Sequence, residues 1–151
     1  MSFVFKMQSI LDIKRKELEA AEAEELAIRQ EISVIEKRIT AIRDAYFADR
    51  DELNEHIRNS LFEKMKIFES SLEDKKERIL ALLSLLNARR HELADCAART
   101  LLLRKKTTSL EKMKERKSKE YDIVTEKKLQ QEIDGRSALA VWRRQQSGEN
   151  G

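Results

Sequence analysis

The chain has 151 residues, of which 39% are charged, and it contains no proline, while its 3 glycines all lie at position 135 or later. Glycine and proline mark the turns of compact domains, so their absence from the first 134 residues argues against a globular fold and favours long helices. The net charge of +3, from 31 basic and 28 acidic residues, is typical of a solvated surface with many salt bridges and gives no sign of nucleic-acid binding.

The chain also lacks the residue patterns of an enzyme or a metal protein. His56, His91 and Cys96 are too scattered to form a tetrahedral metal site, and no glycine-rich turn is present to build an oxyanion site. The single Cys96 excludes an intramolecular disulfide and fits a reducing compartment. No stretch reaches the roughly 18 to 20 apolar residues of a membrane-spanning helix, and the apolar start is too short for a signal peptide. We expect a non-enzymatic protein without metal or cofactor.

An apolar seam runs along the first predicted helix, residues 4–54. Its heptad frame extends from Met7 to Leu53, and eleven of its fourteen positions are apolar. The clearest part consists of Ile28, Ile32, Ile35, Ile39, Ile42 and Tyr46, separated by alternating steps of 4 and 3 residues. Such a repeat predicts that another helix packs along the seam. The three polar exceptions are Lys14, Glu25 and Asp49.

A turn is predicted over residues 55–60. The chain is poor in apolar residues here, and Ser60 followed by Glu63 matches the capping box that starts a helix.

A second helix is predicted over residues 61–134. Its heptad frame runs from Met65 to Leu110, and its polar positions are Lys75, Arg89, Thr100 and Thr107. We therefore predict an all-α fold with one elongated domain, a long antiparallel two-helix coiled-coil hairpin. The alternative is one unbroken helix that dimerises in parallel through both seams.

The two seams suggest a register for the hairpin. With the turn centred near residue 57, Tyr46 faces Phe68 and Ile42 faces Leu72, while Ile39 opposite Lys75 is the poorest match. Glu25 then faces Arg89, so two polar exceptions of opposite charge meet. Such a pair would specify register more than stability.

Beyond Leu110 the second helix has no partner in this register. An overhang of some 25 residues would project roughly 35 to 40 Å past the hairpin at the helical rise. Gly135 is expected to end or kink it, with a tail over residues 135–151. The segment Arg104–Lys119 holds eight basic residues. It fits a solvated helix face or a protein partner better than nucleic acid, because it lacks stacking aromatic residues.

Large aromatic residues gather at the two predicted ends. Phe3 and Phe5 lie at the open end, where they either contact a partner or pack locally. Trp142, beyond them, favours a partner contact. Near the turn, Tyr46 and Phe68 belong to the seam, whereas Phe47 and Phe62 flank it and should be partly exposed.

The two ends of the sequence together resemble a known family. The opening segment, residues 3–19, is similar to the aromatic and basic start of the FliJ/YscO family, which comprises flagellar export proteins and stalk proteins of virulence type III secretion. The closing segments, residues 110–121 and 126–134, are similar to that family's charged C-terminal motif. Met7 and Met113 stand where the family often has leucine, and Leu129 and Gly135 where it often has acidic residues.

The resemblance implies a monomeric antiparallel coiled coil that serves as the central stalk of a bacterial protein export apparatus. Its partners would be the hexameric export ATPase, whose activity it promotes, the cytoplasmic domain of the export-gate membrane protein, and substrate chaperones. Such a protein is cytoplasmic and peripheral to the inner membrane, without insertion and without a nucleic-acid partner. The sequence does not distinguish the flagellar from the virulence system.

The implied contact sites lie at the two ends. The end that faces the ATPase comprises Phe3, Phe5, Arg116, Lys117 and Tyr121, to which the residue pattern adds Trp142. The end that faces the gate comprises Ile39, Ile42, Tyr46, Phe68 and Leu72, and we add the flanking Phe47 and Phe62 because the others occupy seam positions.

Overall fold

The computed structural model describes residues 2–59 and 62–149, and that part of the chain contains two helices and no strand. Helix α1 spans Gln8–Arg58 and helix α2 spans Met65–Glu149. The all-α prediction is confirmed. The chain divides into two compact units. We call Lys16–Leu103 the hairpin unit, and Met1–Arg15 together with Arg104–Gly151 the terminal unit.

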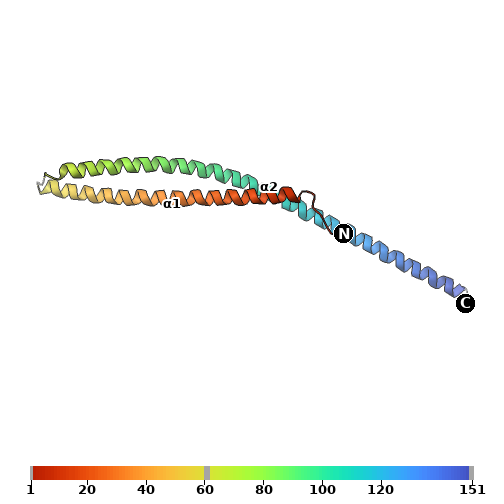
Figure 1. Cartoon of the computed structure of the whole chain (residues 1–151). Coiled ribbons are helices and arrows are strands. Elements are labelled where there is room, and N and C mark those ends of the chain that lie inside the picture. The colour runs from red at the N-terminus through yellow and green to blue at the C-terminus, as the bar shows by residue number, and fades with distance from the viewer. Residues whose placement is uncertain (1, 60–61, 150–151) are drawn as a thin grey trace. The chain divides into compact units, whose positions relative to one another are not determined.

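Within the hairpin unit, α1 and α2 run side by side in opposite directions (Figure 1), so the antiparallel hairpin is confirmed. Both predicted seams are confirmed as well. All fourteen heptad positions from Met7 to Leu53 are buried or half-buried, and so are all fourteen from Met65 to Leu110. The core cluster comprises Ile28, Ile32, Ile35, Leu86 and Cys96. Burial therefore follows a line along each helix, as the 3.5-residue repeat requires.

The connection between the helices lies later in the chain than predicted. Helix α1 continues to Arg58, so most of the predicted turn over residues 55–60 is helical. The N–H of Asn59 still donates to the carbonyl of Glu55, at 3.0 Å, because this polar stretch contains no residue that stops a helix. Helix α2 begins at Met65, four residues later than expected. Ser60 of the expected capping box lies outside the described residues.

The predicted register is wrong for the same reason. The numbers of two facing residues in a hairpin sum to twice the centre of its connection. A connection centred four to five residues later therefore makes each residue of α1 face a residue of α2 about nine positions further along. The ring of Phe68 accordingly contacts His56, at 5.1 Å between ring centroids, where Tyr46 was expected. Asp49, which the predicted register places opposite Met65, pairs with Lys75.

The predicted register pair of Glu25 and Arg89 is replaced by other ion pairs. Arg89 Nε lies 2.9 Å from Glu31 Oε2 on α1, and its Nη1 lies 2.9 Å from Glu92 on its own helix. Glu25 accepts a hydrogen bond from Arg29, one turn further along α1, at 2.8 Å. Two more cross-helix pairs follow the observed register, Arg90 with Glu36 and Arg99 with Glu24.

Both outer limits of the helices also differ from the prediction. Helix α1 begins at Gln8, four residues later than predicted, and residues 2–5 are not helical. The N–H of Gln8 donates to the carbonyl of Phe5 at 3.0 Å. Helix α2 passes through Gly135 and ends at Glu149, so the predicted tail from residue 135 is helical. One glycine inside a helix costs only about 1 kcal/mol relative to alanine, which neighbours such as Ala138 and Leu139 offset.

Candidate partner-binding surfaces

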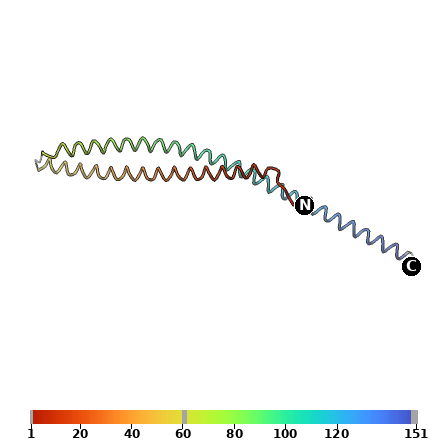
Figure 2. The backbone as a smooth tube through the Cα atoms, in the orientation of Figure 1, coloured from red at the N-terminus to blue at the C-terminus, as the bar shows by residue number. Residues whose placement is uncertain are grey.

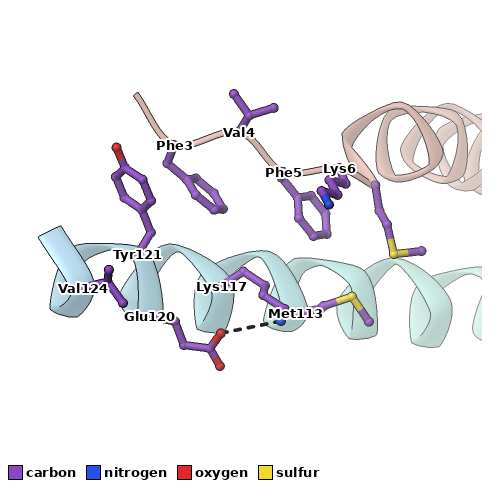
Figure 3. A pocket seen from close by; sticks show the side chains of 10 residues that line it. Phe3, Val4, Phe5, Lys6, Met113, Lys117, Glu120, Tyr121 and Val124 are labelled. Carbon is purple, nitrogen blue, oxygen red and sulfur yellow. Dashed lines mark ion pairs between the residues drawn. The ribbon is translucent and has the colours of Figure 1, made fainter. Parts of the chain in front are cut away.

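The terminal unit carries a short non-helical segment, Ser2–Met7, which we call the strap. Figure 2 shows it leaving the start of α1 and lying beside α2. Side chains of an extended chain alternate between opposite sides. Phe3 and Phe5 therefore both point towards α2, whereas Val4 between them points away and is 76% exposed (Figure 3).

Beneath the strap, α2 and the two phenylalanines line an apolar groove of about 630 Å³. The ring of Phe3 lies 5.7 Å from that of Tyr121 at an interplanar angle of 49°, within the range of favourable aromatic pairs. Phe5 is buried, with only 9% of its surface exposed. The flexible side chains of Met7 and Met113 also line the groove, and methionine fills such irregular gaps well. The aromatic start of the chain thus packs on its own second helix.

Charged side chains border this groove. Lys117 and Glu120 both line it and form an ion pair at 3.6 Å along α2 (Figure 3). Nearby in the terminal unit, Arg15 Nε donates to Glu111 Oε1 at 3.2 Å and ties the first turns of α1 to α2. Both ion pairs are about half exposed, so each contributes at most about 1 kcal/mol. Only the pair of Arg15 with Glu111 joins the two helices.

The structure brings together four of the six residues predicted for the ATPase-facing end: Phe3, Phe5, Lys117 and Tyr121 line one groove. Arg116 and Trp142 do not line it. Trp142 lies near the end of α2 and is 54% exposed. Sequence reasoning missed Met113, Glu120 and Val124. The heptad frame of α2 could have found the last of these, since continuing it past Leu110 reaches Lys114, Lys117, Tyr121 and Val124.

The second candidate surface lies in the hairpin unit, close to the connection between the helices. Its predicted seam residues are half-buried and pack between the helices: Ile39, Ile42, Tyr46, Phe68 and Leu72. The two flanking aromatics are more accessible, with Phe47 48% and Phe62 63% exposed. The rings of Tyr46 and Phe47 meet edge to face at 5.7 Å, so the exposed ring is held by the seam.

A polar cluster fixes the helices next to this surface. Asp49 accepts hydrogen bonds from Ser71, at 2.8 Å, and from Lys75, whose ammonium group also donates to Ser71 at 3.0 Å. The bonds from Lys75 and Ser71 lower the pKa of Asp49 below its usual value of 3.8. Asp49 and Lys75 are both polar exceptions in their seams. The structure places them opposite each other, so each half-buried charge has a partner.

Neither a metal-binding cluster nor a membrane-spanning stretch occurs among the described residues. Within residues 2–59 and 62–149, no group of three or more histidine, cysteine or acidic side chains is arranged to hold a metal ion. No stretch of either helix in this part of the chain combines the length and apolar character that crossing a bilayer requires.

Comparisons with protein-family models, with curated proteins and with solved structures find no match to the chain.

Proposed function

We propose that the chain is a non-enzymatic central-stalk and coupling component of a bacterial type III protein export apparatus, of the FliJ/YscO kind. In this role it binds and stimulates the hexameric export ATPase and links it to the export gate and to substrate chaperones. It works as a monomer in the cytoplasm, peripheral to the inner membrane. The observation that carries the proposal is the aromatic strap on α2, where Phe3, Phe5, Lys117 and Tyr121 line one groove. These are four of the five residues that the family resemblance assigns to the ATPase contact.

The structure bears on the alternative function, a structural scaffold that dimerises through its heptad seam. In the hairpin unit, α1 and α2 already fill each other's seam, and Ile28, Ile35 and Leu86 are less than 9% exposed. A dimer through this seam would have to open the hairpin first. The intramolecular packing therefore favours the monomeric stalk.

Each candidate surface has a role in the proposal. The strap groove in the terminal unit, with Phe3, Phe5 and Tyr121, contacts the ATPase. The exposed rings of Phe47 and Phe62 in the hairpin unit contact the gate, because the seam residues around them are occupied by packing.

The test is to add the purified chain to the export ATPase of the same organism and to measure ATP hydrolysis and ring assembly. Wild type should raise both. A Phe3→Ala, Phe5→Ala variant should lose most of the stimulation, because it empties the groove. A matched control, Leu26→Ala with Leu80→Ala, removes two side chains that are 57% and 58% exposed in the hairpin unit and should stimulate normally.

Circular dichroism should show unchanged helicity for both double variants. The strap is not helical, and in the control alanine, a strong helix former, replaces exposed leucines of α1 and α2. Light scattering should report a monomer. A wild-type chain that leaves the ATPase unaffected, or a stable dimer at micromolar concentration, would refute the proposal.

A further inference from the structure

A row of cations follows one face of α2 in the terminal unit. At 100° per residue, Lys105, Lys112, Arg116 and Lys119 fall within an arc of about 60°. The seam positions of the same segment, such as Thr107, Leu110 and Tyr121, point to the opposite side. All four cations are exposed, whereas those three seam residues are buried or half-buried. The row therefore faces solvent, and the strap groove does not use it.

Little negative charge neutralises this row. Among residues 2–59 and 62–149, no ion pair involves Lys105, Lys112 or Arg116, and only Lys119 has an acidic partner, Glu115 at 3.2 Å. The residues that separate Lys105 from Lys112 on this face are the small, uncharged Thr108 and Ser109. A flat anionic surface could thus approach all four cations at once.

The charge of the chain is also divided between its two units. The terminal unit contains 16 basic and 9 acidic residues, a net charge of +7, whereas the hairpin unit contains 15 basic and 19 acidic residues, a net charge of −4. The small net charge of the whole chain hides this division. An anionic surface would attract the terminal unit and repel the hairpin unit.

The residue types of the row favour a diffuse anionic ligand. Three of its four cations are lysines, which act as hydrated point charges and suit a diffuse layer of anionic groups better than planar, bidentate recognition of carboxylates. The segment Arg104–Lys119 contains no aromatic residue on which a base could stack. Clusters of four to eight basic residues on a helix typically bind anionic lipid headgroups.

We propose that this row, Lys105, Lys112, Arg116 and Lys119, adsorbs the terminal unit to the surface of an anionic lipid bilayer. The contact is electrostatic and superficial, because Thr108 and Ser109 offer no apolar surface to insert. Each cation near such a surface strengthens binding by about five-fold at moderate salt. The row alone therefore gives weak, reversible adsorption that a second attachment point would reinforce.

The test is flotation of the full-length chain with vesicles of phosphatidylcholine alone or with 30% phosphatidylglycerol. Binding should require the anionic lipid and should disappear in 0.5 M salt, where the screening length is only about 4 Å. The variant Lys105→Gln, Lys112→Gln, Lys119→Gln should bind about 100-fold more weakly. The control Lys37→Gln, Lys66→Gln, Lys76→Gln removes the same charge from exposed positions of the hairpin unit and should bind like wild type.

Three outcomes would overturn the inference. These are an absence of binding to anionic vesicles at low salt, an equal loss of binding in both triple variants, and tighter binding to duplex RNA or to polyglutamate than to the vesicles at equal anion concentration. The inference does not rest on the proposed export function. Vesicle flotation contains no ATPase, and ATPase stimulation can be measured without lipid, so either idea can fail while the other stands.

Discussion

The contact between Asp49 and Lys75 gives the sharpest test of the observed register. A double-mutant cycle would use Asp49→Ala, Lys75→Ala and the double variant, and would measure the free energy of unfolding of each. The two side chains are only 22% and 23% exposed, and Asp49 accepts bonds from both Lys75 and Ser71. Exposed ion pairs contribute about 0.2 to 1 kcal/mol, and hydrogen bonds to charged groups about 1.5 to 3 kcal/mol. For this partly buried pair we expect a coupling energy of about 1 to 2 kcal/mol.

Urea denaturation at pH 7, followed by far-ultraviolet circular dichroism, supplies these free energies. A parallel cycle on Glu31 and Arg89, which are 56% and 34% exposed, should give less than about 1 kcal/mol because solvent screens that pair. A coupling energy below about 0.3 kcal/mol for Asp49 and Lys75 would refute the register. So would a larger coupling between Glu25 and Arg89 than between Glu31 and Arg89.

Three further predictions concern burial and protonation. Leu11→Ala truncates a side chain with 0% exposure and should lower the free energy of unfolding by roughly 2 to 4 kcal/mol. The neighbouring Ile10→Ala, at 44% exposure, should lower it by less than about 1 kcal/mol. Thermal denaturation compares the two variants, and equal losses would contradict the assigned seam. The pKa of Asp49 in the folded chain lies below 3.8, so the stabilisation by its carboxylate is present above that pH and is lost as the pH falls through the folded pKa. The difference in unfolding free energy between wild type and Asp49→Asn should therefore shrink below about pH 4 in a series of urea denaturations. A constant difference would count against the pKa shift. Cys96 has 0% exposure and its Sγ lies 3.6 Å from the carbonyl oxygen of Ala21, so a thiol reagent should modify it only in denaturant; rapid labelling of the native chain would show an open seam.

The candidate sites could be predicted only in part. The sequence identified Phe3, Phe5 and Tyr121 as residues of one end, and the structure shows how they meet: the extended strap directs both phenylalanines to the same side. The prediction missed that geometry because it extended the first helix back to residue 4, whereas α1 begins at Gln8. In a helix, Phe3 and Phe5 would lie about 200° apart and could not line one groove.

The pairing of the polar residues within the two apolar seams was also predicted only in part. Sequence reasoning held that two polar exceptions of opposite charge should face each other, and it selected Glu25 with Arg89. The structure pairs Asp49 with Lys75, which also removes the poor match of Ile39 against Lys75. The rule was sound, but the chain offered more than one pair of exceptions that could satisfy it.

The sequence by itself determined both helices and the face that each one buries, since a heptad repeat is a local property of the chain and needs no knowledge of the partner. Only the tertiary structure decided the register. An apolar seam that repeats every seven residues packs almost equally well after a slip of one heptad, so burial alone does not choose between registers. The register depends on the position of the connection between Arg58 and Met65. It also depends on a few polar contacts such as that of Asp49 with Lys75, because a slipped hairpin would leave these half-buried charges without partners.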